Sequence, residues 1–356
     1  SKRKTPFTFF PSKCYFLTEP LGVSLIIAPW NYPVQLLLNP LVGAIGAGCT
    51  AVLKPSPYVP NVAMVLERII KATFDEEYIA IVQGNREVNT ALLKERYDII
   101  FFTGSPDLGR VVMRAAAENL TPVVLELGGK SPVIIDRTAD IKLAAKRVAW
   151  GKSLNAGQTC IAPDYLLIHS EVKEQFVEAY KNALHELLGD DASKSEHYVR
   201  MVSDKAFKRV SGYLNEGRIR CGGATNAEER YIEPTLLDQV SPDSAIMREE
   251  IFGPVLPMIE IENTEEAINF ILQREKPLAL YVFAEQQEAE RVVNLTSSGG
   301  ACINDVIMHI ANEYMPFGGV GNSGMGRYHG RDSLYSFSHR RSVLATSTKI
   351  DLPFRY

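Results

Sequence analysis

Two hydrophobic patterns alternate along most of the chain, beginning near residue 20. Short apolar runs with few polar interruptions, such as residues 24–29 and 98–104, are typical of strands that are buried on both faces. Between them, apolar residues recur at helical spacing with charges on the opposite face, as in residues 62–74. Buried strands that alternate with helices predict a parallel sheet covered by helices on both faces.

The alternation predicts two successive α/β units. In the first unit we expect strands at residues 24–29, 50–56, 79–84, 98–104 and 122–129, and helices at 31–48, 62–74, 86–95 and 108–120. In the second unit we expect strands at residues 165–170, 231–240, 254–261, 279–284 and 298–306, and helices at 171–188, 206–217, 265–274 and 286–295. The predicted boundary between the units lies near residues 128–130.

The two ends of the chain have a different character, rich in aromatic and β-branched residues. Residues 5–18 predict two short strands joined by a turn, and residues 335–347 predict a further strand. We therefore divide the chain into a β-hairpin (1–19), a doubly wound α/β domain (20–127), a second α/β domain (128–330) and a C-terminal segment (331–356).

Composition narrows the class of protein. A chain of 356 residues can form two domains, because single hydrophobic cores stop growing near ~250–300 residues. The net charge of −4 favours neither nucleic acid nor an anionic membrane as a partner, and no apolar run approaches the ~18 residues of a membrane span. The five cysteines are odd in number and form no CxxC or Cys/His pair, so we expect a reducing, cytoplasmic setting and no metal site.

One cysteine lies in an unusual setting. Residues 150–165 place Cys160 among small and flexible residues, with Pro163 close behind, whereas core cysteines usually lie within apolar runs. The small neighbours leave room for a reactant to approach the sulfur. A reactive thiol and a buried structural cysteine are equally consistent with this stretch alone.

Two polar residues elsewhere could serve such a thiol. Glu126 ends an apolar strand, where a carboxylate either pairs with a cation or has a raised pKa that suits a general base. Asn31 lies in APWNYP between two prolines, so its amide is held rigidly and could donate to an oxyanion. A salt-bridged glutamate and an ordinary turn asparagine remain alternatives for these two positions.

Three further motifs bear on ligand binding. Ser105 and Pro106 predict a capped helix start after a strand, where free N–H groups can hold a phosphate, although a plain capped helix is an alternative. Gly319, Gly321 and Gly324 match GxGxxG but follow no predicted strand and open no helix, so we predict that they do not bind a dinucleotide. In EEIFGP, Glu250 and Phe252 form an acidic–aromatic pair on a loop.

Taken in order, these motifs resemble the aldehyde dehydrogenase superfamily. PWNYP, KPS, FTGSPDLG, LELGGK, GQTC, EEIFGPV and PFGGVGNSGMG occur in the order of that family and cover nearly the whole chain. GQTCIAPDY and SHRRSVL further resemble its class 3 branch, which acts on medium-chain, fatty and aromatic aldehydes. The family carries another helical N-terminal segment, which we expect to be absent here because the chain begins at Ser1.

The resemblance implies a role for each part of the chain. Residues 20–127 would bind NAD or NADP, residues 128–330 would carry catalysis, and the two ends would bridge a homodimer. Cys160 would be the nucleophile, Asn31 the oxyanion donor and Glu126 the base that activates water. The residues assigned to the cofactor are Trp30, Lys54, Ser105, Gly128, Glu250 and Phe252, and those assigned to the aldehyde tunnel are Tyr32, Trp150, Leu154 and Phe317.

Three questions of function follow from the resemblance. Pro57 occupies a position where many NAD-preferring relatives carry a glutamate that bonds the ribose, so we hypothesise that both NAD and NADP are used. The expected reaction is oxidation of an apolar aldehyde to its acid.

Two alternative functions remain. The first is a CoA-acylating enzyme, in which a glutamate such as Glu126 is generally missing. The second is a cofactor-independent thiol esterase, which would need neither Ser105 nor Glu250. The sequence does not identify the aldehyde.

Overall fold

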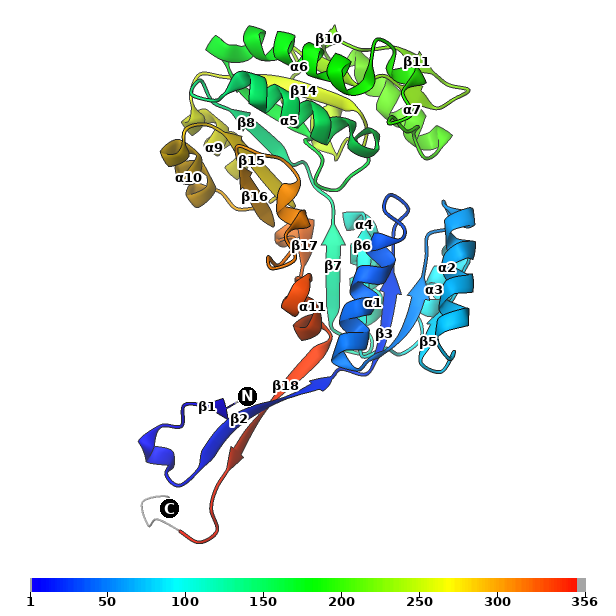
Figure 1. The fold of residues 1–356 in the computed structure, drawn as a ribbon, viewed down its shortest axis with the longest axis vertical. Helices are drawn as coiled ribbons and strands as arrows, with labels where there is room; N and C mark the ends of the chain where they lie inside the picture. Colours follow the sequence, from blue (N-terminus) through cyan, green and yellow to red (C-terminus); the bar gives the residue numbers. More distant parts are fainter. Residues whose placement is uncertain (1, 351–356) are drawn as a thin grey trace.

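The computed structural model describes residues 2–350 as two lobes with a narrow arm (Figure 1). The lower lobe contains the strands and helices from the first third of the chain, and the upper lobe contains most of the remainder. The arm projects away from both lobes, carries both described ends of the chain and holds β2 and β18 side by side. This arrangement matches the predicted class, a doubly wound α/β unit, a second α/β unit and a small β element.

The lower lobe is a six-stranded sheet with the order β17-β7-β6-β3-β4-β5. All its neighbouring strands are parallel except β17, which pairs antiparallel with β7. The strands are β3 (Val23–Ile27), β4 (Thr50–Lys54), β5 (Ile79–Ile81), β6 (Ile99–Gly104), β7 (Val123–Leu127) and β17 (Gly324–Met325). The helices are α1 (Gln35–Ala47), α2 (Pro60–Thr73), α3 (Arg86–Leu92) and α4 (Pro106–Ala117). Strand β17 joins this sheet from the segment that we assigned to the second domain.

The upper lobe is a seven-stranded sheet with the order β10-β13-β14-β9-β8-β15-β16. Its strands are β8 (Pro132–Ile135), β9 (Tyr165–His169), β10 (Arg218–Cys221), β13 (Thr235–Asp238), β14 (Val255–Ile261), β15 (Ala279–Phe283) and β16 (Gly300–Ile303). Its helices are α5 (Ile141–Ser153), α6 (Lys173–Leu188), α7 (Asp204–Gly212), α8 (Ala245–Arg248), α9 (Thr264–Leu272) and α10 (Gln286–Leu295). A separate ribbon pairs β11 (Thr225–Asn226) with β12 (Tyr231–Ile232).

The prediction omitted two central elements of the upper lobe. Residues 131–153 were assigned neither strand nor helix, yet they form β8 and α5. Strand β8 is only four residues long, although all four of its residues are buried. In α5 the buried residues Ile141, Ala144, Ala145 and Val148 recur at helical spacing after a capping Asp140, so the prediction missed a signal that the sequence carries.

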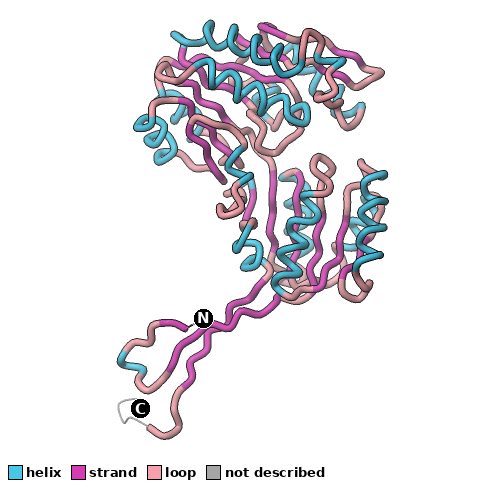
Figure 2. The backbone as a smooth tube through the Cα atoms, in the orientation of Figure 1, coloured by secondary structure: helices cyan, strands magenta, loops and turns pink. Residues whose placement is uncertain are grey.

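The arm is a three-stranded antiparallel sheet in the order β1-β2-β18 (Figure 2). Its strands are β1 (Lys2–Arg3), β2 (Lys13–Pro20) and β18 (Ser338–Ala345), and β18 follows the short helix α11 (Gly330–Ser336). The prediction of two strands within residues 5–18 was wrong. Residues Phe7–Phe9 form a 3-10 turn, and only β2 is a strand in that range. The predicted strand at the C-terminal end is confirmed, and residues 351–356 of that segment lie outside the described residues.

The two lobes face each other through opposite ends of their sheets. Asn31 and Ser105 follow the carboxyl ends of β3 and β6, whereas Lys130 and Cys160 precede the amino ends of β8 and β9. All four residues line one cavity. The carboxyl edge of an open parallel sheet is where ligands usually bind, so the lower lobe supplies the standard ligand edge and the upper lobe closes it.

A buried carboxylate holds one edge of the upper sheet together. Asp238, at the end of β13, is only 1% exposed. Arg218 donates to both of its carboxylate oxygens at 2.9 and 2.7 Å, and Arg220 adds a bond of 2.7 Å from the same strand. Lys173 at the start of α6 lies 3.4 Å away. The bonds from Arg218 hold the pKa of Asp238 below its usual range.

We predict that Asp238→Asn lowers the free energy of unfolding by about 2–4 kcal/mol at pH 7, because it leaves three cations without their shared partner. Urea denaturation measures the change. The folded-state pKa is lowered, so the difference between variant and wild type should shrink as the pH falls below about 4. Glu265→Gln is the control, since its pair with Arg291 is exposed on both sides and should change stability by less than about 0.5 kcal/mol. Equal effects in the two variants would contradict this account.

Candidate active site

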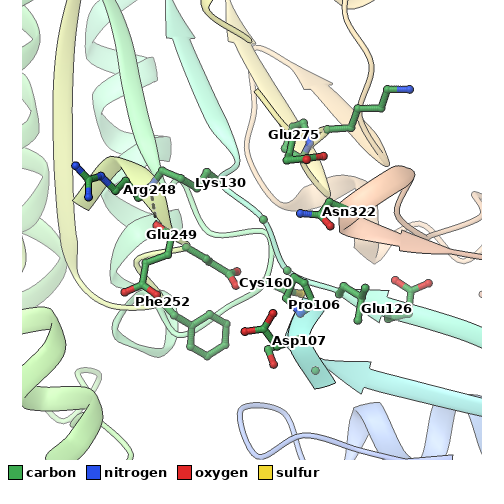
Figure 3. Close-up of a pocket in the computed structure, with 18 of the residues that line it drawn as sticks. Pro106, Asp107, Glu126, Lys130, Cys160, Arg248, Glu249, Phe252, Glu275 and Asn322 are labelled. Atoms are coloured by element: carbon green, nitrogen blue, oxygen red, sulfur yellow. Dashed lines mark hydrogen bonds between the residues drawn. The ribbon is translucent and has the colours of Figure 1, made fainter. Parts of the chain in front are cut away.

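A cavity of about 800 Å³ lies where the two lobes meet. Figure 3 shows Pro106, Asp107 and Glu126 of the lower lobe and Glu249 and Phe252 of the upper lobe arranged around Cys160. Residues that are distant in sequence therefore share one space. The predicted site residues that line this cavity are Trp30, Asn31, Ser105, Glu126, Gly128, Cys160, Glu250 and Phe252.

The loop before Cys160 has an unusual backbone. Asn155, Ala156 and Gly157 all have positive φ, at 50°, 51° and 70°. Asn and Gly tolerate this left-handed conformation, but Ala does not favour it. A side chain at position 157 would place its Cβ 2.3 Å from the carbonyl oxygen of Gly253. The glycine therefore lets the loop pack directly on the neighbouring backbone.

Hydrogen bonds hold this loop in place. Gln158 is 2% exposed and donates to the carbonyls of Asn155 and Arg200 at 3.0 and 3.2 Å. It also accepts a bond of 3.0 Å from the N–H of Val202. Sequence reasoning missed Asn155 and Gln158 as structural residues of the site. An Asn-Ala-Gly run before the cysteine was the available signal for a left-handed turn.

Asn31 is joined to the same loop. Its Nδ2 donates to the carbonyl oxygen of Gln158 at 3.1 Å, and its own carbonyl accepts from Asn155 at 3.3 Å. An amide nitrogen carries two protons, so one N–H fixes the side chain and the other remains for a ligand. Asn31 and Cys160 both line the cavity.

Burial controls the electrostatics of Cys160 and Glu126. Burial raises the pKa of the Cys160 thiol, and the charges of Glu250 and Glu126 raise it further, whereas the N–H groups of Cys160 and Ile161 favour the thiolate. Glu126 is 3% exposed, and neither carboxylate oxygen has a hydrogen-bond partner among the described residues. Burial raises the pKa of Glu126 well above the usual range, with partial compensation by Arg327. An unpaired buried carboxylate of this kind can accept a proton near neutral pH.

An aromatic pair and a carboxylate occupy the part of the cavity next to Cys160. The rings of Trp30 and Phe252 meet edge to face, with centroids 5.5 Å apart. Glu250 lies against Gly128, where an added Cβ would be 2.1 Å from its Oε2. Its Oε1 is buried without a partner, and burial, with the charge of Asp164, raises the pKa of Glu250 to about 8. An unsatisfied buried oxygen beside an aromatic pair fits a ligand with a planar ring and a hydroxyl group.

The start of helix α4 has the geometry predicted for it. Ser105 caps the helix by accepting from the N–H of Leu108 at 3.4 Å, and Pro106 occupies the first turn. The positive end of the helix opens into the cavity, which suits an anionic group such as pyrophosphate. Arg110, one turn along, is held by Asp107 at 3.0 Å and by Asn322 at 2.7 Å.

The GxGxxG match does not open a helix, as its context predicted. Gly321–Ser323 form a 3-10 turn that leads into β17. The glycines instead allow close backbone packing, since a Cβ on Gly324 would lie 2.3 Å from the carbonyl oxygen of Leu125. A Cβ on the neighbouring Gly318 would lie 3.1 Å from Oε1 of Glu126. This segment therefore packs against the strand that carries the base.

Five predicted residues do not line the cavity. Lys54 is 1% exposed, and its Nζ donates to the carbonyl of Pro55 at 2.8 Å. Tyr32 lies close to the nucleophile, because its hydroxyl bonds the hydroxyl of Thr159 at 2.7 Å. Trp150 and Leu154 pack against the hydrophobic core near the end of α5, and Phe317 is buried within that core. The structure thus places the expected aldehyde residues outside the lining of this cavity.

An ion pair that sequence reasoning missed supports the loop of Glu250. Lys130 pairs with Asp164 and donates to the carbonyls of Ile246 and Glu249 at 2.8 and 3.0 Å. Asp164 in turn accepts from the N–H of Ile251 at 2.9 Å. Lys130 lies in the motif LELGGK and Asp164 in GQTCIAPDY, but the residues that they contact are distant in sequence.

Comparison with known proteins identifies this arrangement. A family model described as "Aldehyde dehydrogenase family" matches residues 3–343. The chain belongs to the aldehyde dehydrogenase family. The resemblance carried by the ordered motifs is thereby confirmed, and the enzyme is an oxidoreductase that acts on aldehydes. Within residues 2–350, no group of three or more His, Cys, Asp and Glu side chains could hold a metal ion.

Named aldehyde dehydrogenases match most of the chain. A 4,4'-diaponeurosporen-aldehyde dehydrogenase of Staphylococcus aureus is 51% identical over 350 residues, which are 98% of this chain and 76% of the relative. A dimeric NADP-preferring aldehyde dehydrogenase of Rattus norvegicus is 49% identical over 94% of this chain and 74% of the relative. An aldehyde dehydrogenase family 3 member A2 of the same species is 48% identical over 95% and 70%, in agreement with the class 3-like motifs.

A solved aldehyde dehydrogenase structure has the same fold. The substrate-bound state of Staphylococcus aureus AldH superimposes with a TM-score of 0.96 at 50% sequence identity. The match covers 99% of this chain and 77% of that chain. Among residues 2–350, no helix combines the length and the apolar character that crossing a bilayer requires.

The contact between Gly128 and Glu250 generates a prediction about cofactor binding. Gly128→Ala should weaken NAD(P)H binding at least tenfold, because the new Cβ displaces the Glu250 carboxylate. Fluorescence titration with NADH and NADPH measures the affinity. Gly212→Ala is the matched control, since its Cβ would meet nothing within 4 Å, and its affinity should stay within twofold of wild type. Equal affinities in the two variants would rule out this role for Glu250.

Proposed function

We propose that this aldehyde dehydrogenase oxidises apolar aldehydes, of medium or long chain or aromatic, to carboxylic acids with NAD or NADP. The observation that carries the proposal is the meeting of Cys160, Asn31 and Glu126 in one cavity, with both oxygens of Glu126 unpartnered. Nucleophile, oxyanion donor and base come from three separate segments of the chain. Their convergence has no evident structural purpose, because a buried unpaired carboxylate destabilises the fold.

The cavity fits a dinucleotide cofactor, and aldehyde dehydrogenases use NAD or NADP. Trp30, Phe252 and the unsatisfied Oε1 of Glu250 would hold the nicotinamide ring and its ribose. Ser105 and the N–H groups that begin α4 would hold the pyrophosphate. When bound, an oxidised nicotinamide supplies a positive charge that favours the thiolate and an acceptor for hydride.

In the first half of the reaction, Cys160 attacks the aldehyde. Water accepts the S–H proton, the thiolate sulfur bonds to the carbonyl carbon, and the anion of a thiohemiacetal forms. The free N–H of Asn31 and the backbone N–H of Cys160 would bind the oxygen, which is negative in the transition state. Loss of hydride from that carbon then leaves a thioester on Cys160. The fixed loop of residues 155–158 keeps the sulfur in place for both events.

In the second half, Glu126 would activate water. A carboxylate takes one proton from water while the oxygen attacks the thioester carbon, and the C–S bond breaks to give the acid and regenerate Cys160. The raised pKa of Glu126 makes it a stronger base than an ordinary glutamate. Glu126 also argues against a CoA-acylating enzyme, in which a thiol must replace water. The features that suit a cofactor, including the cap at Ser105, argue against a simple thiol esterase.

The remaining assignments rest on the arm, the ends of the chain and the cysteines. We propose a homodimer bridged by the arm, whose exposed side chains include Leu17 of β2 and, in the segment between β1 and β2, Phe7 and Phe10. The relative described as dimeric supports this assembly. All five cysteines are free, and we propose a reducing, cytoplasmic setting. The division into bridging, dinucleotide-binding and catalytic segments follows the sheets, with β17 returning to the dinucleotide-binding part.

Two variants test the mechanism together. Cys160→Ala should abolish both aldehyde oxidation and ester hydrolysis. Glu126→Gln should release one equivalent of NAD(P)H in a burst and then slow at least 100-fold, because the thioester forms but water is not activated. Stopped-flow absorbance with quantified acid product measures both phases. Retained oxidation by Cys160→Ala, or unchanged steady-state turnover by Glu126→Gln, would contradict the assigned roles.

Cofactor preference tests the consequence of Pro57. Because position 57 has no carboxylate to bond the ribose or to repel a 2′-phosphate, both NAD and NADP should support turnover. We expect their kcat/KM values to lie within 100-fold, or about 2.7 kcal/mol. Pro57→Glu should shift the ratio toward NAD by at least tenfold. A wild-type preference for NAD above 100-fold would overturn the hypothesis.

A further inference from the structure

A second cavity, of about 350 Å³, lies in the upper lobe and shares no lining residue with the active-site cavity. The active site adjoins the amino edge of the upper sheet, whereas this cavity lies at the carboxyl edge of its parallel strands. Asp136 directly follows β8, His169 ends β9 and Glu262 directly follows β14. We call the cavity the carboxyl-edge pocket and define it by six of its lining residues, Asp136, Arg137, His169, Glu262, Glu285 and Glu288.

The chain leaves two neighbouring strands of this sheet in opposite directions. Strand β8 leads through α5 to β9 on one side, and β15 leads through α10 to β16 on the other. In open parallel sheets, ligands usually bind outside the carboxyl ends of strands at such a change of direction. Asp136 and Glu285 follow these two strands. The hydroxyl of Thr138 joins them, because it donates to Asp136 at 2.6 Å and accepts from the N–H of Glu285 at 2.9 Å.

Two buried side chains offer polar atoms to the pocket. Asp136 is 7% exposed, and its Oδ1 accepts from the N–H and the hydroxyl of Thr138, whereas its Oδ2 accepts no hydrogen bond within residues 2–350. His169 is 5% exposed, and its Nδ1 accepts from the N–H of Glu171 at 3.3 Å. A ring nitrogen that accepts carries no proton, so Nε2 bears the N–H, and it has no acceptor in the described part of the chain. Polar atoms of buried side chains are normally hydrogen-bonded, so this pair points to a bound partner.

The two side chains are close enough to share one small molecule. Ile135 of β8 is paired in register with Ile168 of β9, and Asp136 and His169 are the next residues along the two strands. Neighbouring strands lie about 4.8 Å apart. An acceptor oxygen and an N–H donor at that separation fit a molecule that combines a donor with an acceptor.

Charge decides which donor the pocket favours. Four of its lining residues carry a carboxylate, and one, Arg137, carries a guanidinium. Glu288 is paired with Arg291 at 2.9 Å. Glu285 forms a hydrogen bond only through its backbone N–H among the described residues, so its carboxylate is open to a ligand. A lining with more carboxylates than cations favours a positively charged donor.

We propose that the carboxyl-edge pocket binds a small organic cation, a primary amine with an oxygen acceptor a few atoms away. Its ammonium group would donate to Oδ2 of Asp136 and to the carboxylate of Glu285, and its oxygen would accept from Nε2 of His169. A metal ion fits less well, because Nε2 carries a proton and offers no lone pair. The volume of the pocket is within the range of small-molecule sites. This inference is independent of aldehyde oxidation.

The test uses three probes of equal size, 4-amino-1-butanol, pentylamine and butane-1,4-diol. Pentylamine lacks the acceptor oxygen, and the diol lacks the charge. Ligand-observed NMR titration at low ionic strength, without aldehyde or cofactor, measures each Kd. For ligands this small, we expect the wild-type protein to bind the amino alcohol with a Kd of about 1–10 mM. Pentylamine should bind about fivefold more weakly and the diol at least tenfold more weakly, as for the loss of a hydrogen bond and of a charged one.

Three variants assign the binding to the pocket. Asp136→Asn should weaken binding of the amino alcohol at least tenfold, and Glu285→Gln about fivefold. His169→Asn keeps an acceptor near the position of Nδ1 but removes the Nε2 donor, so the amino alcohol and pentylamine should bind it with equal affinity within twofold. Glu290→Gln is the matched control, because Glu290 is an exposed residue of α10 that does not line the pocket, and its affinity should stay within twofold of wild type.

Several outcomes would overturn the inference. One is the absence of wild-type binding at amino alcohol concentrations up to about 50 mM. Another is equal affinity in Asp136→Asn, Glu285→Gln and Glu290→Gln, because the amine would then bind elsewhere, such as in the active-site cavity. A diol that binds as well as the amino alcohol, an unchanged preference for the amino alcohol in His169→Asn, or displacement by Mg²⁺ at less than about a tenth of the amine concentration would refute the assigned ligand class. If Asp136→Asn fails to fold, as judged by circular dichroism, the exposed Glu285→Gln site carries the same comparison.

Discussion

The site depends on a backbone constraint, the left-handed run of Asn155, Ala156 and Gly157 before Cys160. Such a run is costly for a residue with a Cβ, so it persists only because its surroundings fix it. Gln158 and Asn155 provide the hydrogen bonds, and the absence of a side chain on Gly157 permits contact with Gly253. The same bonds join Asn31 to the loop. Cys160 and Asn31 therefore belong to one hydrogen-bonded unit, although 129 positions of sequence separate them.

Repulsion among three buried acidic groups is the second constraint on the site. Glu126, Glu250 and Cys160 lie within one cavity, and burial raises the pKa of all three groups. Ionising any one of them raises the cost of ionising the others. Mutual repulsion among these three acidic groups destabilises the folded protein when no cofactor is bound. The positive charge of an oxidised nicotinamide would reduce that repulsion. In the proposed mechanism, binding of the cofactor would therefore favour the thiolate of Cys160 and link cofactor binding to the first chemical step.

Local sequence predicted those parts of the structure that local physics determines. The apolar runs of β3, β4, β6 and β7, the cap at Ser105 and the poor context of the GxGxxG match were all legible in the chain. Strand β8 and helix α5 were missed, although the apolar run of β8 and the helical spacing of Ile141, Ala144 and Val148 are present in the sequence. Residues 5–10 have a strand-like composition but form a turn and loop instead of a strand. Gln158 and Asp164 were missed since their partners, such as Val202 and Ile251, are far away in sequence.

The chain passes between the lobes twice, and both crossings lie beside Glu126. Residues 128–131 lead from β7 to the upper sheet, and the return path brings Gly318 and β17 back against the strand that carries Glu126. A rotation of one lobe relative to the other would turn about an axis through these two connections. Points near an axis travel least. Glu126 would then stay almost stationary, and the parts of the two lobes farthest from the connections would move most.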